Sequence, residues 1–137
     1  MNARFAALLL STVLAFGWST AVSAAPATKR VLYITTTAGY HHDACEYSVP
    51  VFKKMASATG FLEVVASDKV DLVNAEALKK FDAVVFSNTS GPKSKFGLSD
   101  EDALELIDFV KKGKAFVGVH AATDSLADWP PYVEMIG

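Results

Sequence analysis

The sequence predicts an α/β domain built on a parallel β-sheet, and three observations support this prediction. Four short apolar segments rich in β-branched residues alternate with segments of helical character, and this alternation is typical of βαβ units. The last of them, Ala115–Val119, is a continuous apolar run, as expected for a buried strand of a parallel sheet. With 137 residues, the chain is long enough for one domain at most.

We expect the strands at Val31–Thr36, Leu62–Ala66, Ala83–Ser87 and Ala115–Val119. The first, third and fourth strands should lie side by side, which gives the order 2-1-3-4 of a flavodoxin-like sheet with helices on both faces. Open sheets of this kind bind ligands in the crevice outside the carboxyl ends of their strands. Residues that directly follow a strand are therefore the candidates for a functional site.

The first helix poses a conflict between two local signals. Asp43 and Glu46 have the spacing of a capping box, whereas Pro50 would break a helix already under way there. We therefore expect a turn at Asp43, followed by a helix with Ser48 as its N-cap and Pro50 in its first turn. This helix should end at Gly60, where a left-handed backbone is readily adopted.

Three further helices are expected after the second strand. A weak one spans about 74–80, and a stronger one has Ser99 as its N-cap and ends at Gly113. The residues of the stronger helix expected to face inward are Leu104, Ile107, Phe109 and Val110. A last helical pattern covers Pro131–Ile136.

Residues 1–24 have the three parts of a secretory signal peptide. These parts are the basic start Met1–Arg4, the apolar run Phe5–Phe16 and the small-residue cleavage site Val22–Ala24. We expect cleavage after Ala24 or Ala25 and a secreted or periplasmic protein; an uncleaved anchor is the alternative. The apolar run is shorter than the roughly 20 residues of a membrane-spanning helix, so no stable membrane insertion is expected after cleavage.

Composition excludes several classes of function. Without Arg4, the chain after the leader carries 12 basic and 15 acidic side chains, and it has no basic stripe interleaved with aromatic residues, which argues against nucleic acid as a partner. Neither a G-x-G-x-x-G nor a P-loop motif is present, so we expect no cofactor. Cys45 is the single cysteine, so no intramolecular disulfide can form.

Three segments carry a resemblance to a known family. They are Thr35–Asp43 (TTTAGYHHD), Val85–Gly91 (VFSNTSG) and Gly118–Asp124 (GVHAATD). In this order they resemble motifs of the trehalose-utilisation (ThuA-like) family, a member of the class I glutamine amidotransferase-like superfamily. The sequence departs from the family pattern at His41, where arginine is common, and at Pro92, where an acidic residue is common.

The resemblance covers 31–137, with 25–30 as a linker after the leader. Members of the family continue with further strands, so we expect this domain to be the N-terminal part of a longer fold, whether through fragmentation or gene truncation. One edge of the sheet should then stay uncovered, and exposed edges favour association, so a homo-oligomer is a possible state. The resemblance implies a carbohydrate ligand, with trehalose-type disaccharides or their keto derivatives as the class.

Polar residues after three strands form the predicted site. His120 and His42 are the candidate catalytic residues, since an imidazole can act as a general acid or base. The candidate substrate-binding residues are Asn88, Thr89, Asp124 and Thr37. Asp124 has two interpretations of similar weight: it orients His120 or binds a sugar hydroxyl, or it caps the next turn. His41 is interpreted as a solvated loop residue.

A metal site is not expected. His42, His120 and Asp124 could supply ligands, but they come from separate loops without a local ligand spacing. The family's amidotransferase relatives carry a nucleophilic cysteine after the fourth strand, where this chain has His120, so glutamine hydrolysis is not expected. Cys45 is interpreted as a buried packing residue.

Two classes of function stay open, and a third possibility is that the chain is a non-functional remnant of a longer domain. The protein is either an enzyme of acid/base chemistry on a sugar, by isomerisation, elimination or hydrolysis, or a non-catalytic carbohydrate-binding or accessory module. Paired carboxylates flanking a glycosidic bond are not evident, which argues against an ordinary glycosidase.

Overall fold

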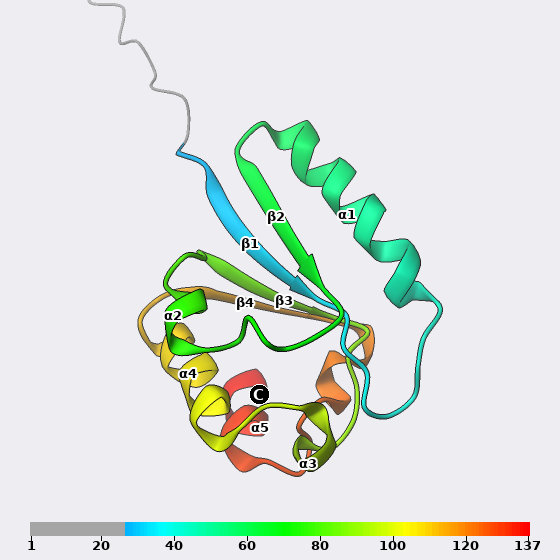
Figure 1. Ribbon diagram of the computed structural model, residues 1–137, viewed down its shortest axis with the longest axis vertical. Helices are drawn as coiled ribbons and strands as arrows, with labels where there is room; N and C mark the ends of the chain where they lie inside the picture. The colour runs from blue at the N-terminus through cyan, green and yellow to red at the C-terminus, as the bar shows by residue number, and fades with distance from the viewer. Residues whose placement is uncertain (1–26) are drawn as a thin grey trace, which may run out of the picture.

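The computed structural model describes residues 27–137, and it contains one four-stranded parallel sheet (Figure 1). The strands are β1 (Lys29–Ile34), β2 (Leu62–Ser67), β3 (Ala83–Ser87) and β4 (Ala115–Val119). Their order is β2-β1-β3-β4, which confirms the predicted flavodoxin-like α/β fold. The predicted signal peptide, residues 1–24, lies outside the described residues.

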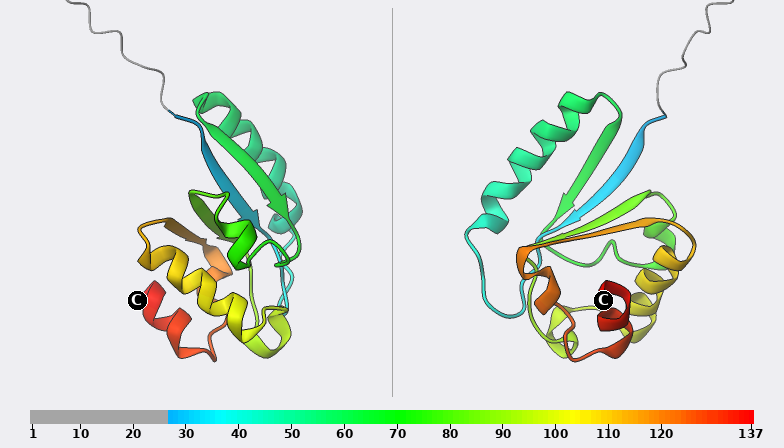
Figure 2. Two further views of the ribbon diagram at one scale, coloured as in Figure 1. Left: turned by 60° about the vertical axis from the view of Figure 1, so that its left-hand side comes forward. Right: turned by 180° about the vertical axis from the view of Figure 1, so that it is seen from behind.

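Helices cover both faces of the sheet (Figures 1 and 2). The helices are α1 (Ala44–Thr59), α2 (Ala75–Leu78), α3 (Lys93–Phe96), α4 (Asp100–Lys111), the 3₁₀ helix η1 (His120–Asp124) and α5 (Pro130–Ile136). Helix α1 packs on one face, whereas α2, α4 and α5 pack on the other. Within residues 27–137, none of these helices has the length and apolar character needed to cross a membrane.

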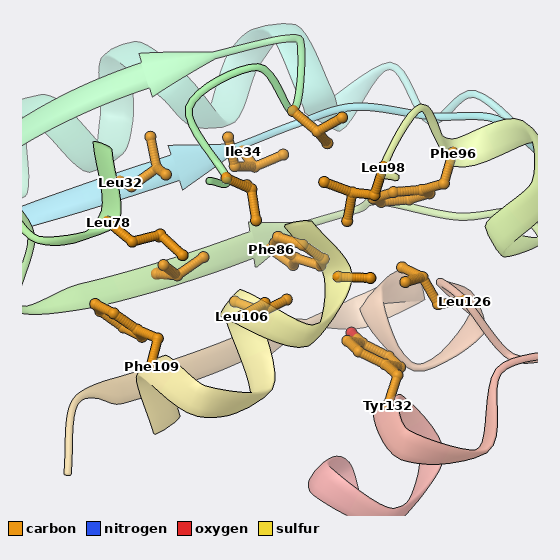
Figure 3. Packing of buried hydrophobic residues seen from close by; sticks show 14 of the residues in the cluster. Leu32, Ile34, Leu78, Phe86, Phe96, Leu98, Leu106, Phe109, Leu126 and Tyr132 are labelled. Atoms are coloured by element: carbon orange, nitrogen blue, oxygen red, sulfur yellow. The ribbon is translucent and has the colours of Figure 1, made fainter. Parts of the chain in front are cut away.

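The larger core lies between the sheet and α2, α4 and α5 (Figure 3). Alternate strand residues such as Ile34 and Phe86 point into it and meet Leu106 of α4 and Tyr132 of α5. All four of these side chains are fully buried. This core packs against one face of β3 and β4 and thereby supports the carboxyl ends of these strands.

The smaller core lies under α1 and is confined to one half of the sheet. Tyr33 and Val85 pack here with Phe52 of α1, whose ring stacks on Tyr33 with centroids 4.6 Å apart. Over β4 the same face is open, and Val117 and Val119 are 46% and 41% exposed. The apolar run of β4 therefore forms an edge strand with one exposed face, rather than a fully buried strand.

Helix α1 begins earlier than the sequence predicted. It starts at Ala44, so Ser48 and Pro50 lie inside it, and Asp43 makes no side-chain capping hydrogen bond. Pro50 lacks the N–H that would bond to the Glu46 carbonyl, but both residues are exposed, so water can solvate that carbonyl. The helix ends at Gly60, in the left-handed conformation that was predicted there.

Helix α4 begins as predicted, because the Ser99 hydroxyl accepts a hydrogen bond from the Asp102 N–H at 3.0 Å. Its inward face is wrong at one position: Leu104 is 53% exposed. Ala103, Leu106 and Ile107 are buried instead. Residues three and four apart share a helix face, so a stripe through 103, 106 and 107 places residue 104 on its flank.

Candidate functional site

Two of the three histidines meet at the carboxyl edge of the sheet. His42 lies on the loop between β1 and α1, and His120 directly follows β4. Their ring centroids are 4.6 Å apart with the planes inclined by 46°. The Tyr40 ring packs edge-on against His42, at 4.8 Å. The structure therefore brings the two predicted catalytic residues together, although they lie 78 positions apart in the chain.

His120 has an unusual backbone conformation. Its φ is +55°, in the left-handed region that non-glycine residues seldom occupy. This conformation costs about 1–2 kcal/mol and is enriched at functional sites. It turns the chain sharply from β4 into η1 and leaves the imidazole exposed at the top of the sheet.

The turn at His120 is the start of η1, and a hydrogen bond between η1 and α5 holds it in place. The Ala122 carbonyl accepts a hydrogen bond from the Tyr132 hydroxyl at 2.8 Å, and both residues are buried. Gly118 allows η1 to pack close to β4, because a Cβ at position 118 would lie 3.2 Å from the Ala122 Cβ. Burial raises the pKa of Tyr132 far above its usual range, so the hydroxyl stays protonated and remains a donor.

Asn88 directly follows β3 and has the same φ of +55°, but its side chain is buried. Its backbone N–H donates to the Val119 carbonyl at 3.1 Å, and its side-chain amide donates to the Ser87 hydroxyl at 3.1 Å. The Ser87 hydroxyl also accepts a hydrogen bond from Tyr33 at 2.7 Å. Asn88 thus belongs to a buried polar network that joins three strands, and its role in binding a ligand stays a prediction.

Thr89 lies deeper still, with no exposed surface. Its hydroxyl accepts a hydrogen bond from the Ser125 hydroxyl at 2.7 Å. This bond links the end of β3 to the residue that follows η1. Thr89 therefore supports the floor of the site, and a direct contact with a ligand stays a prediction.

Two further predicted ligand-binding residues are Thr37 and Asp124. Thr37 precedes His42 on the loop after β1, and Asp124 follows His120 at the end of η1. The Thr37 hydroxyl is 3.3 Å from His41 Nδ1, and its backbone forms a β-bridge with Ser90. The Asp124 carbonyl accepts a hydrogen bond from the Gly91 N–H at 3.1 Å. Within residues 27–137 the Asp124 carboxylate forms no hydrogen bond, to His120 or otherwise, and it is exposed. It is free to meet a ligand.

Ser90 is a residue of the site that the sequence did not single out. It is buried, and its carbonyl accepts hydrogen bonds from the N–H groups of Ala38 and Gly39, at 2.7 and 3.1 Å. Its hydroxyl donates to the Tyr40 carbonyl at 2.8 Å. These three bonds fix the loop that presents His42. The sequence shows only a Ser-Gly-Pro turn here, and the pairing of that turn with a distant loop leaves no local pattern.

Gly91 makes the same loop contact possible. Its φ is +112°, and a Cβ at this position would lie 2.6 Å from backbone atoms of Ala38 and Gly39. No side chain fits in that space. The packing of the loop after β3 against the loop that presents His42 therefore depends on a glycine at position 91.

Cys45 lies near the site but has the properties of a packing residue. It is buried, and its Sγ is 3.8 Å from the Asn88 carbonyl oxygen. Burial raises the pKa of the Cys45 thiol, so the unreactive protonated form dominates at neutral pH. The position directly after β4 is occupied by His120.

Metal ligands do not gather around the histidines. Among residues 27–137, no group of three or more histidine, cysteine, aspartate or glutamate side chains could hold a metal ion. What the site does offer is two imidazoles in contact, an exposed tyrosine ring and an exposed carboxylate.

Comparison with known proteins gives a consistent result. The family model for ThuA, described as trehalose utilisation, matches residues 30–137. The structure resembles the crystal structure of a ThuA-like protein from Bacteroides uniformis ATCC 8492, with a TM-score of 0.61 and 24% identity. The likeness covers 88% of this chain and 48% of that protein, so the chain spans about half of its length. Among curated proteins, none matches. The chain belongs to the ThuA (trehalose utilisation) family.

Proposed function

We propose that this protein binds a carbohydrate at the carboxyl edge of its sheet and moves protons on it with His42 and His120. The observation that carries the proposal is the contact between the two imidazole rings, 4.6 Å apart, at the site expected for a ligand in this fold. Two neighbouring imidazoles can serve as a base and an acid in one reaction, because an imidazole ring has one nitrogen that can accept a proton and another that can donate one.

The groups around the histidines suit a sugar. Tyr40 is 74% exposed beside His42, and an exposed aromatic ring can pack against the apolar face of a pyranose. The Asp124 carboxylate is available to accept hydrogen bonds from sugar hydroxyls. The family description, trehalose utilisation, supports the same substrate class.

The proposed chemistry is general acid/base catalysis, by isomerisation, elimination or hydrolysis of a trehalose-type disaccharide or a keto sugar. Amidotransferase activity is not part of the proposal, because the residue after β4 is His120 and the thiol of Cys45 is buried on α1. Secretion is proposed from the signal-peptide pattern of residues 1–24.

One observation favours a second function, carbohydrate binding without chemistry. His120 is exposed, whereas catalytic groups are commonly enclosed in a site that excludes water. A binding or accessory module would use the same tyrosine, carboxylate and histidines to hold a sugar. It would have no turnover to lose.

Substituting each histidine separates the two functions. Asparagine tolerates the left-handed backbone, so His120→Asn removes the imidazole with little effect on the fold. With trehalose or 3-keto sugars as substrates, conversion followed by NMR should fall about 10²–10⁴-fold in His120→Asn and His42→Gln. Lys54→Ala is the control, because Lys54 lies on the exposed surface of α1, outside the ring pair.

Retained conversion in both variants would contradict the catalytic proposal. Binding of these sugars without conversion by the wild-type chain would instead support the accessory function.

A further inference from the structure

A cavity of about 580 Å³ lies beside the histidine pair, at the carboxyl ends of β1 and β2 and against the first half of α1. Neither His42 nor His120 lines it. Small-molecule sites are usually concave and of this size, so the cavity is large enough for a ligand of its own.

The loop after β1 separates this cavity from the histidine pair. His41 lines the cavity, with Nδ1 at 3.3 Å from the Thr37 hydroxyl and Nε2 at 3.9 Å from the Glu46 carboxylate. His42, the next residue, contacts His120 instead. Consecutive Cα atoms are only about 3.8 Å apart, so these adjacent histidines place the cavity and the histidine pair on two sides of the same loop.

Cys45 closes the cavity on its inner side. Its side chain lines the cavity and also lies 3.8 Å from the carbonyl oxygen of Asn88, which ends β3. The cavity therefore extends to within one side chain of the polar network beneath the histidine pair. A ligand with two linked rings could occupy both places by crossing the loop.

The polar lining suits a neutral polyhydroxylated ligand. Glu46 and Asp68 supply carboxylates, Lys53 supplies an ammonium group, and Thr35 and Thr37 supply hydroxyls. Two carboxylates against one ammonium group disfavour an anionic ligand. Sugar hydroxyls, by contrast, donate to carboxylates and accept from ammonium groups.

The lining also has an apolar part and a free donor. Val49 of α1 and Ala66 of β2 form an apolar wall, against which the C–H face of a sugar ring can pack. Within residues 27–137, Lys53 forms no ion pair. Its ammonium group is thus available to a ligand.

We propose that this cavity binds the second, non-reacting ring of a disaccharide whose reacting ring lies against His42 and His120. The proposal rests on the proposed function and deepens it, because it makes the preferred substrate a disaccharide rather than a monosaccharide. Lys53 and the Thr35 hydroxyl would hold the second ring, while Val49 and Ala66 pack on its apolar face.

Adjacent lysines on α1 provide a matched test. Both are exposed, but only Lys53 lines the cavity. In isothermal titration calorimetry on the chain from residue 26 onward, the wild type should bind trehalose roughly tenfold more tightly than glucose. Lys53→Ala should remove most of this preference by weakening trehalose binding alone, since it removes a charged hydrogen-bond donor. Lys54→Ala should behave as the wild type.

A second pair of variants tests the shape of the cavity. Val49→Phe fills it, whereas Val51→Phe places the same side chain at a position that is 57% exposed and outside the cavity. Val49→Phe should abolish the trehalose preference and Val51→Phe should keep it, with thermal melts confirming that both variants fold.

The outcomes separate this proposal from the proposed function. Equal affinity of the wild type for trehalose and glucose, or a preference that survives both Lys53→Ala and Val49→Phe, would overturn the second-ring pocket and leave the histidine pair unaffected. A preference lost in these variants, together with trehalose and glucose affinities that are both unchanged by His42→Gln and His120→Asn, would support the pocket and contradict contact of the reacting ring with the histidine pair. Binding of neither sugar would overturn both.

Discussion

Asn88 and His120 directly follow two neighbouring strands and have the same left-handed backbone, yet their side chains have opposite surroundings. Asn88 is 4% exposed and hydrogen-bonded within a polar network, whereas His120 is exposed and contacts the ring of His42. The sharp turn after β3 thus directs a side chain into the protein, and the turn after β4 directs one toward solvent. The same local conformation can hold a fold together at one strand end and present a reactive group at the next.

Substituting Asn88, the buried residue of this pair, should lower the free energy of unfolding more than substituting His120. Asn88→Ala removes the amide bonded to Ser87 and leaves a residue that disfavours positive φ. We expect it to lower the free energy of unfolding by about 2–4 kcal/mol, as the sum of strain and a lost buried hydrogen bond. Urea denaturation measures this loss. A cost below that of His120→Ala would contradict the comparison.

Removing the Tyr132 hydroxyl, which donates a hydrogen bond to η1, should lower stability less. Tyr132→Phe keeps the ring that packs on Phe86 but removes the hydrogen bond to the Ala122 carbonyl. We expect a loss of about 1 kcal/mol in the free energy of unfolding, together with reduced sugar conversion because η1 positions His120. Unchanged conversion with reduced stability would show that η1 supports the fold but does not position the histidine.

At His120 itself the backbone strain can be relieved. Glycine adopts positive φ without steric cost, so His120→Gly should be more stable than His120→Ala by about 1 kcal/mol. Thermal melts of the two variants measure the difference. Both should lack activity, since both lack the imidazole. Equal stability would mean that the turn relaxes once the ring is gone.

The smallest expected effect on stability is that of Asp82, which lies at the amino-terminal edge of the sheet, opposite the site. The Arg30 N–H and the Lys114 side chain lower the pKa of Asp82. A folded-state pKa below the unfolded value means that Asp82 stabilises the fold above about pH 4, and that this contribution is lost as pH falls through the folded pKa. Melting temperatures of Asp82→Asn should therefore depend less on pH below about 4 than those of the wild type. Parallel curves would contradict this assignment.

The sequence was sufficient for the strand order and for the meeting of the two histidines. Apolar segments rich in β-branched residues located all four strands, and the carboxyl ends of adjacent parallel strands necessarily lie at one edge. A strand order of β2-β1-β3-β4 then places the residues after β1 and β4 on either side of β3. That geometry follows from pattern alone.

Other features depend on tertiary contacts and could not be predicted. The positive φ of His120 is stabilised by η1 and Tyr132, and the bonds from Ser90 to the loop of Tyr40 join residues 50 positions apart. The start of α1 was wrong because the cost of Pro50 depends on whether the Glu46 carbonyl is solvated. Each of these cases depends on long-range contacts or on solvent exposure, and both are properties of the whole fold.

The most direct test of the central claim is NMR of the histidine rings, since the chain contains only His41, His42 and His120. With signals assigned from His41→Gln, His42→Gln and His120→Asn, trehalose or a 3-keto sugar is titrated into the wild-type protein. The histidine-pair account predicts that the signals of His42 and His120 shift together and saturate at the same ligand concentration. Saturable sugar binding that leaves both signals unmoved would contradict it.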